Sequence, residues 1–217
     1  AEKELRRLGE GGLRPLSETL VDGDTTEQRI AVSLLGEMGN PSAAQALLSL
    51  ASAAQSQEKR DDEKGKAEDL HAIRGVDIDL VVDAILAAAR LTDPHSARVF
   101  AQLAQSREKE IRIAALYGLA QIGARLEKNE AAVLEQLASE IGNGTASVGL
   151  ISPSVRAMAI LGVGELYEGR SLPPRLRTQL LTTLERRRRQ PEDVDDQLTQ
   201  ATAHALGRTR ERTAIPV

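Results

Sequence analysis

The 217-residue sequence has no cysteine and no tryptophan, and Phe100, Tyr117 and Tyr167 are its only aromatic residues. Without cysteine, neither a disulfide bond nor a thiolate metal centre can form, and the redox state of the compartment leaves no trace in the sequence. Because aromatic residues make up only 1% of the chain, its core has to be filled by Leu, Ile, Val and Ala. Leu and Ala are strong helix formers, so the composition favours closely packed helices over a β-sandwich.

Long hydrophobic runs are also missing, since no stretch approaches the roughly 20 apolar residues that cross a bilayer. No secretory signal is recognisable at the start of the sequence, so we expect a soluble, cytoplasmic protein. The chain begins at Ala1, however, and a periplasmic location remains the alternative if Ala1 follows a cleaved signal. The net charge of −4 argues against a protein whose whole surface binds nucleic acid.

The sequence repeats itself, and this repetition predicts the fold. Three segments, 28–40, 111–123 and 155–166, each place an Arg near the start and small residues through the middle. Segments 5–9, 81–93 and 200–207 match parts of the same pattern. A small residue recurs at Gly9, Gly36, Ala89, Ala120, Gly164 and Gly207, with spacings of 27, 53, 31, 44 and 43 residues. The last two spacings match two-helix repeats of roughly 40–47 residues.

Second helices are predicted between these segments, because apolar residues recur there every three or four positions. These stripes fall within 13–20, 43–50, 97–104, 133–141 and 176–184. Helix boundaries are marked by the sequences Gly39-Asn40-Pro41-Ser42, Asp93-Pro94, Ser152-Pro153-Ser154 and Gln190-Pro191-Glu192. A polar N-cap followed by Pro in the first turn is a typical helix start. Stacking of such pairs would bury the apolar stripes, and the small residues would let neighbouring repeats approach closely.

This pattern resembles the HEAT-repeat family in its bacterial HEAT-like form, over nearly the whole chain except residues 53–78. The resemblance implies an all-α fold, an α-α superhelix of about five to six helical pairs. It also implies a single domain over 1–217 with a charged insertion at about 53–78. Arg29 departs from the pattern, since it lies one residue later than Arg112 and Arg156 in this register. Neither end shows the polar cap that solenoids need, which favours either a piece of a longer array or ends that another molecule covers.

A basic segment is the main candidate for binding a partner. It holds seven arginines and one acid, Glu185, and the arginines are Arg170, Arg175, Arg177, Arg186, Arg187, Arg188 and Arg189. Guanidinium groups bind phosphates and carboxylates through paired hydrogen bonds, so this segment could bind an acidic protein or a nucleic acid. The structural alternative is that the last four arginines end a helix and pair with Glu192, Asp193, Asp195 and Asp196, which begin the next one.

Three further features have a structural explanation that we prefer. Residues 56–69 carry charges of both signs, which predicts a solvated loop, with a segment that orders on a partner as the alternative. The Gly-rich segment 142–149 lacks the Lys of a phosphate-binding loop, so we expect a connection within a repeat. His71, His95 and His204 have no partner at metal-ligand spacing. Asp77 and Asp79 are expected to cap the helix that starts near Leu80 rather than to bind a metal.

The sequence therefore predicts an interaction scaffold that is not an enzyme, without catalytic, cofactor-binding or metal-binding residues. Its partner would be another protein, bound on a concave face of second helices or on the basic segment, within a larger complex. The first alternative is nucleic-acid or phosphate binding through the region from Arg175 to Arg189. The second is a HEAT-like enzyme, such as a bilin lyase or a DNA glycosylase. Those activities need an aromatic-lined pocket, and three aromatic residues hardly supply one.

Overall fold

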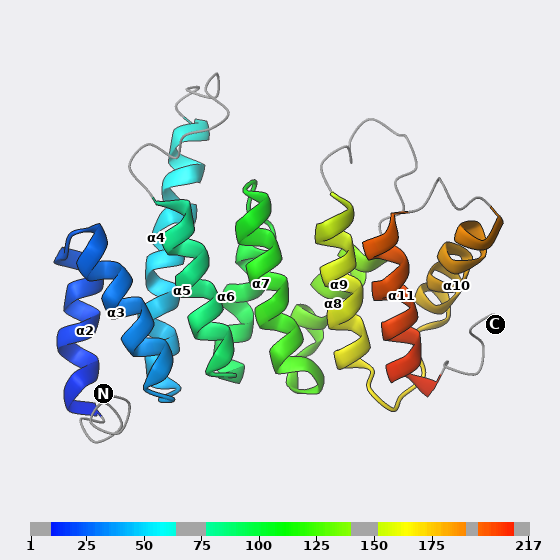
Figure 1. Cartoon of the computed structure of the whole chain (residues 1–217), viewed down its shortest axis with the longest axis horizontal. Coiled ribbons are helices and arrows are strands. Elements are labelled where there is room, and N and C mark those ends of the chain that lie inside the picture. The colour runs from blue at the N-terminus through cyan, green and yellow to red at the C-terminus, as the bar shows by residue number, and fades with distance from the viewer. Residues whose placement is uncertain (1–9, 64–76, 140–151, 190–194, 211–217) are drawn as a thin grey trace. The chain divides into compact units, whose positions relative to one another are not determined.

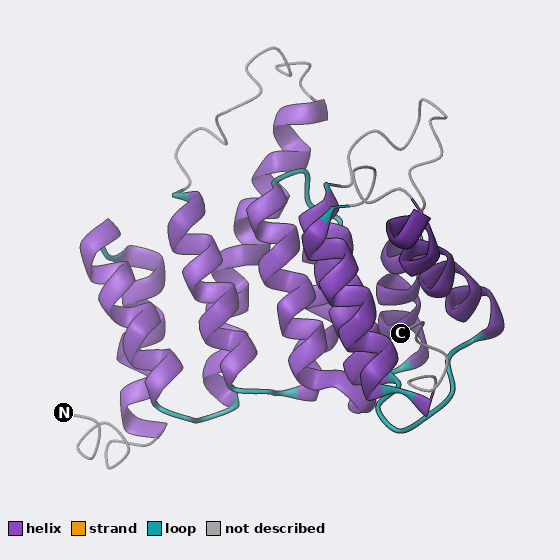
Figure 2. Cartoon of the chain, turned by 45° about the vertical axis from the view of Figure 1, so that its right-hand side comes forward, coloured by secondary structure: helices purple, strands orange, loops and turns teal. Residues whose placement is uncertain are grey.

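The computed structural model describes residues 10–63, 77–139, 152–189 and 195–210, and within these ranges all regular structure is helical (Figures 1 and 2). The α-helices are α2 (Glu10–Asp22), α3 (Thr25–Glu37), α4 (Ser42–Glu63), α5 (Ile78–Arg90), α6 (Ala97–Leu103), α7 (Lys109–Ile122), α8 (Lys128–Ser139), α9 (Pro153–Leu166), α10 (Pro174–Arg189) and α11 (Asp196–Arg208). A 3-10 turn, Pro94–Ser96, precedes α6, and another, Gly123–Arg125, follows α7. The predicted all-α fold is confirmed.

The chain divides into two compact units, residues 1–118 and 119–217, with the boundary inside α7. In the first unit, α3 lies beside α5 in one row of helices, and α2, α4 and α6 follow one another in a second row. In the second unit, α9 lies beside α11, and α8 and α10 pack behind them. Each unit is therefore a stack of helix pairs, while a single domain over the whole chain stays a prediction.

The small residues of the repeat do bring neighbouring helices together. A Cβ atom added at Gly36 of α3 would lie 3.0 Å from the Cβ of Ala87 in α5. One added at Gly164 of α9 would lie 2.9 Å from the Cα of Ala205 in α11. The separation at Gly164 is shorter than real Cβ contacts and the one at Gly36 is at their short limit, so a side chain at either position would require the neighbouring helix to shift. The predicted role of these glycines in close packing is confirmed.

The helix starts that the sequence marks are also confirmed where the structure describes them. The Asp77 carboxylate accepts a hydrogen bond from the Leu80 amide at 3.2 Å and caps α5. Asp93 accepts from the amide of His95 at 3.1 Å, and Ser152 accepts from the Val155 amide at 3.3 Å at the start of α9. Each bond satisfies an amide that the first turn leaves without a helical partner. The boundary at 190–192 lies outside the described residues.

The expectation of a loop over 56–69 is wrong for its first part. Helix α4 is 22 residues long and runs on to Glu63, so residues 56–63 are helical. Gln, Glu, Lys and Arg have high helix propensity, and no Gly or Pro occurs in the sequence between Ser42 and Gly65 to end the helix. Charge of both signs made this segment look like a loop, whereas local propensity favours continuation of α4. Residues 64–76 lie outside the described residues.

The Arg at the start of the first described repeat binds the cap of the next one. Arg29 of α3 donates to the Asp77 carboxylate, with 2.8 Å between Nη2 and Oδ2, and its Nη1 lies 3.9 Å from Asp83. The hydrogen bond from Arg29, followed by the one from the Leu80 amide, holds the pKa of Asp77 below its usual 3.8. The motif Arg thus connects α3 to the N-terminus of α5.

We predict that replacing Arg29 by Gln raises the pKa of Asp77 toward 3.8, as measured by NMR titration of the carboxyl carbon. An acid whose pKa is lowered on folding stabilises the protein above its unfolded pKa and loses that contribution as the pH falls through its folded pKa. The small difference in Tm between the wild type and Arg29→Gln should therefore be present at neutral pH and disappear in acid. The control Arg90→Gln, which removes an exposed Arg elsewhere, should leave the Asp77 titration unchanged; an equal shift in both variants would contradict the assignment.

Candidate partner-binding surface

The helix that carries most of the predicted arginines is held to the second unit by one apolar face. Leu176 and Leu180, four residues apart, are buried, and α10 packs against α11 and α8 through this face. Along the helix, the hydroxyls of Thr178, Thr182 and Thr183 donate to carbonyls of the preceding turn. These hydroxyl groups are therefore satisfied within α10, whose polar side carries exposed arginines.

The seven arginines do not form one surface. Arg175 and Arg177 belong to the first turn of α10 and Arg186, Arg187, Arg188 and Arg189 to its last turn. Arg175 and Arg186 are eleven positions apart in the sequence, which corresponds to about 16 Å along a helix axis. Arg170 lies before the helix, in the connection from α9. The last turn is the densest part of the segment, and cations there also complement the helix dipole.

Arg170 is held by its own neighbours. Its guanidinium lies 5.4 Å from the centre of the Tyr167 ring and donates to the carbonyl of Leu166 at the end of α9. The Tyr167 hydroxyl in turn donates to Glu135 of α8 at 2.5 Å. Burial, together with this bond to a carboxylate, raises the pKa of Tyr167 to about 12. Arg170 therefore contacts the end of α9 and the Tyr167 ring, and its part in binding a partner stays a prediction.

One of the four arginines in the last turn of α10 pairs with an acidic residue of the next helix, which is the structural alternative given above. Arg187 pairs with Asp196 of α11, with 2.5 Å between Nη2 and Oδ1. Asp195 is used as a cap and accepts from the amides of Gln197 and Leu198, while Glu192 and Asp193 lie outside the described residues. Within the described part of the chain, Arg186, Arg188 and Arg189 form no such ion pair and are exposed. Three of the four arginines thus remain accessible.

A further arginine, which sequence reasoning assigned only to the repeat motif, lies near this turn. Arg156 of α9 donates from Nε to the carbonyl of Ala138 at 3.3 Å, near the C-terminus of α8. Its Nη2 is buried and has no hydrogen-bond partner among the residues that the structure describes. Burial lowers the pKa of Arg156, and repulsion from Arg186 lowers it further. We define the basic cluster as Arg156, Arg186, Arg188 and Arg189.

The other predicted features add no second candidate of this kind. The Gly-rich segment 142–149 and His71 lie outside the described residues. His204 lies 3.9 Å from Glu165, which also binds Arg208. In the described ranges no group of three or more His, Cys, Asp or Glu residues could hold a metal ion. None of the helices described is long and apolar enough to cross a membrane.

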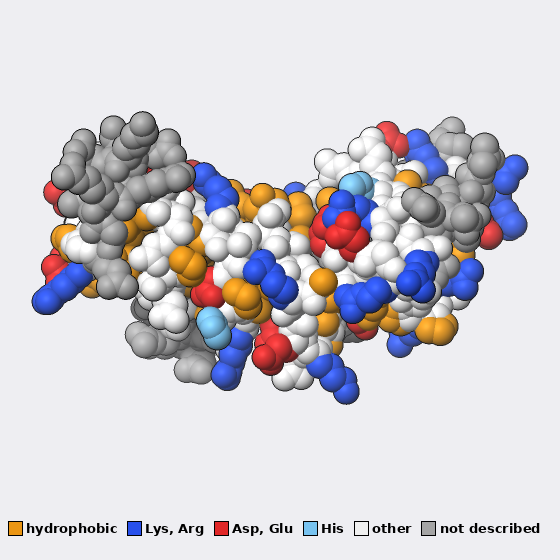
Figure 3. Space-filling view, turned by 90° about the horizontal axis from the view of Figure 1, so that it is seen from below, with side chains coloured by type: hydrophobic (Ala, Val, Ile, Leu, Met, Phe, Trp, Pro, Cys, Tyr) orange, Lys and Arg blue, Asp and Glu red, His pale blue; other side chains and the backbone are white. Residues whose placement is uncertain are grey.

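Positive and negative side chains are mixed on the face of the molecule drawn in Figure 3. On the face drawn in Figure 3, Lys and Arg side chains are interspersed with Asp and Glu, and apolar side chains appear as small separate patches. A nucleic-acid-binding face usually carries a continuous basic stripe, which this face does not show. On this face, recognition of an anion would therefore depend on a local group of cations rather than on a continuous stripe.

Comparison with known proteins finds similar solved structures but no family. No protein-family model matches the chain, and no curated protein is significantly similar to it. An engineered protein, solved by a structural genomics consortium, is similar with a TM-score of 0.48 and 15% identity over 96% of this chain and 83% of that chain. A designed armadillo repeat protein in complex with the peptide (KR)4 is similar with a TM-score of 0.46 and 17% identity, over 95% and 85%.

The stacked helix pairs of each unit define the class to which the chain belongs. It is an all-α helical-repeat protein of the solenoid type. Membership of the HEAT family in particular stays a prediction, because no family model matches.

Proposed function

We propose that this chain is a HEAT-like repeat scaffold without enzymatic activity, and that its basic cluster binds an acidic segment of a partner protein. The observation that carries this proposal is the guanidinium of Arg156, which has a buried nitrogen without an acceptor and lies close enough to Arg186 to be repelled by it. A partly buried cation that is not neutralised is unfavourable. A carboxylate from a partner, bound by the exposed Arg186, would offset the repulsion between the two guanidinium groups.

A protein partner fits this cluster better than a nucleic acid does. The chain carries a net charge of −4, and nucleic-acid affinity depends on neutralising several phosphates at once. Single-stranded nucleic acids also need aromatic side chains for base stacking, and neither Tyr nor Phe belongs to the basic cluster. The concave face of second helices remains a second predicted surface for the same scaffold function.

The test compares two charge-reversed variants of the full chain. In the first, Arg186, Arg188 and Arg189 are replaced by Glu, while Arg187 is kept because it pairs with Asp196. In the second, the exposed Arg90, Arg98 and Arg125 receive the same change, which matches the total charge. Binding of a labelled glutamate-rich peptide and of a labelled single-stranded oligonucleotide is measured by fluorescence anisotropy at low and moderate salt.

We expect the peptide to bind the wild type and the second variant alike, and the first variant at least about tenfold more weakly, since close charge pairs carry interface affinity. Affinity purification from nuclease-treated native lysate should then recover the same stoichiometric protein with the wild type and the control only. Equal peptide binding by both variants would contradict the assignment to the basic cluster. Preferential, salt-sensitive binding of the oligonucleotide would instead indicate a phosphate-binding protein.

A further inference from the structure

The first helix pair exposes apolar side chains that the rest of the described chain buries. Val21 of α2 is 76% exposed and Ile30 of α3 is 54% exposed, and these are the large hydrophobic residues left exposed among the described residues. Single exposed apolar residues such as Val21 are ordinary, but Ile30 belongs to the lining of a hollow, which indicates a contact surface there. This surface is independent of the basic cluster.

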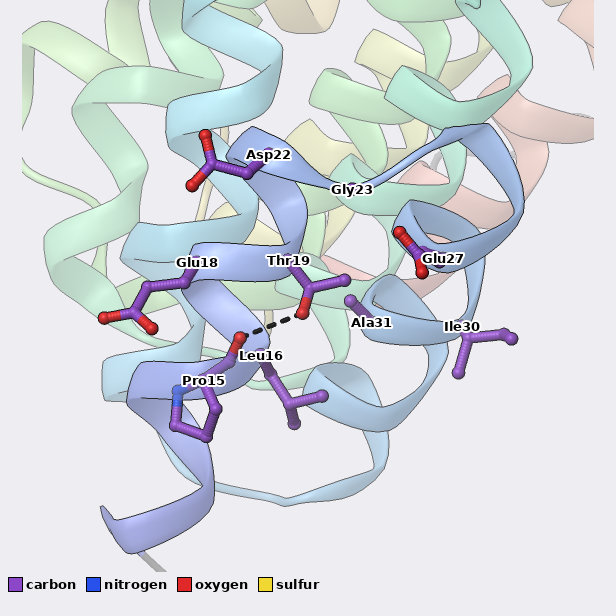
Figure 4. A pocket seen from close by; sticks show the side chains of 9 residues that line it. All are labelled: Pro15, Leu16, Glu18, Thr19, Asp22, Gly23, Glu27, Ile30 and Ala31. Atoms are coloured by element: carbon purple, nitrogen blue, oxygen red, sulfur yellow. Dashed lines mark hydrogen bonds between the residues drawn. The ribbon is translucent and has the colours of Figure 1, made fainter.

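A hollow of about 550 Å³ lies between α2 and α3, within the first unit (Figure 4). Its apolar lining includes Leu16 from α2 and Ile30 and Ala31 from α3. Hollows of this size accept one or two large side chains of a ligand. Because Leu16 is half-buried and Ala31 is fully buried, the floor of the hollow belongs to the protein core, and its inner side is not in contact with water.

Local geometry keeps this hollow open. The hydroxyl of Thr19 donates to the carbonyl of Pro15 at 3.0 Å (dashed in Figure 4), so it is satisfied within α2 and does not bring water to the floor. At the turn between the helices, a Cβ atom added at Gly23 would lie 2.5 Å from the Thr19 carbonyl oxygen and 3.0 Å from Thr19 Cγ2. Glycine at position 23 therefore lets α3 turn back closely over α2, and Ala31 leaves the space below it unfilled.

The rim of the hollow is acidic. Glu18 and Asp22 from α2 and Glu27 from α3 belong to its lining, and no Lys or Arg among the described residues does. Glu18 pairs with Arg14 at 2.9 Å, and Glu27 accepts from the Asp24 amide at 3.0 Å as part of a capping box. Both pairs are exposed, so solvent screens them and a competing cation can approach. An apolar floor with three carboxylates around it complements a ligand that is apolar at its centre and positively charged at its edges.

We propose that this acidic hollow, lined by Leu16, Ile30 and Ala31 under Glu18, Asp22 and Glu27, docks a cationic amphipathic segment of a partner protein. A Leu-like side chain of that segment enters the hollow, and Lys or Arg residues one helical turn away face the carboxylates. Burial of the apolar side chain supplies affinity, and the charges set orientation and exclude acidic segments.

The probe for this proposal is a labelled helical peptide of leucine and lysine, with leucine on one face, titrated with the full chain and followed by fluorescence anisotropy. Two companion peptides carry Glu in place of Lys or Ser in place of Leu. The first variant is Ile30→Ala, whose matched control is Val21→Ala, a more exposed aliphatic residue outside the hollow. The second variant combines Glu18→Gln with Asp22→Asn, and its control combines Glu37→Gln with Glu110→Gln, which are exposed acids elsewhere.

The leucine–lysine peptide should bind the wild type, whereas both companion peptides should bind it poorly. Ile30→Ala should weaken binding by about fivefold, as expected for partial loss of a buried aliphatic contact. Removal of the two carboxylates should weaken it by about tenfold, and both control variants should bind like the wild type. Circular dichroism of all four variants checks that they fold alike.

Equal weakening by variants and controls would overturn the proposal, because the peptide would then be attracted only by net charge. Sedimentation velocity of the chain alone tests whether a second copy of the chain occupies the hollow. A concentration-dependent dimer that Ile30→Arg abolishes would show that a second copy of this chain occupies the hollow, and would also overturn the proposal. Binding of the glutamate-rich peptide tests the basic cluster, and binding of the leucine–lysine peptide tests the acidic hollow. The two proposals can therefore fail separately.

Discussion

Replacing Gly164 by Ala should lower the free energy of unfolding by about 2 kcal/mol, although Ala is the better helix former. The added Cβ atom would lie 2.9 Å from the Cα of Ala205 and 3.2 Å from its Cβ. Since the obstacle is backbone, no side-chain rotation can relieve the contact, and α9 and α11 must move apart. The measurement is urea unfolding followed by far-ultraviolet circular dichroism, which reports on the helices.

The same substitution at Gly207 is the matched control and should act in the opposite direction. Gly207 lies in α11, at the equivalent position of the repeat, and an added Cβ atom there meets nothing within 4 Å. Gly207→Ala should therefore raise the free energy of unfolding by roughly 0.5–1 kcal/mol through helix propensity alone. If both substitutions changed stability in the same direction, the close approach of α9 and α11 at Gly164 would be wrong.

Replacing Phe100 by Ala should have the larger effect, a loss of about 3–5 kcal/mol. Phe100 is 1% exposed and is the only phenylalanine in the chain, so its removal leaves a large cavity in the core. Gly118 of α7 lies directly over the ring, since a Cβ atom there would be 2.7 Å from Cε1. Thermal and urea unfolding of the single variant measure the loss.

A double-mutant cycle tests whether Gly118 exists to accommodate that ring. In the wild type, Gly118→Ala should destabilise the protein because the methyl group meets the ring of Phe100. In the Phe100→Ala background the same methyl group enters the empty space and should be neutral or stabilising. Additive effects of the two substitutions would contradict a direct contact between residues 100 and 118.

Much of the fold could be predicted from the sequence because its signals are local. The caps at Asp77, Asp93 and Ser152 need only their own first turn, and the stripes of second helices need only their own helix. What the sequence could not separate were the roles of the glycines within one motif. Gly36 and Gly164 face the next first helix, whereas Gly118 faces Phe100. A Cβ atom added at Gly162 would lie 2.9 Å from Leu134 Cδ2 in the preceding second helix.

The candidate sites were harder to predict because they combine residues from different helices. Arg156 and Arg186 are 30 positions apart, and only the packing of α8, α9 and α10 brings their charges within reach of each other. Arg170 looked equivalent to the other arginines but is held by Tyr167 and Leu166. The acidic hollow left no signal, since nothing in the stripe that contains Leu16 indicates that Ile30 would remain exposed.

The glycine contacts of the two units also determine how cooperatively each unit can melt. In a stack of helix pairs, each pair is stabilised by its contacts with the neighbouring pairs alone, so the stack behaves as a one-dimensional chain of coupled elements. Gly36 and Gly164 lie at two of these couplings, where helices meet backbone to backbone. Widening such a junction weakens the coupling more than it weakens either helix pair. Enlarged residues there would thus broaden the unfolding transition and leave partly folded species, whereas Gly207→Ala would shift a transition of unchanged width.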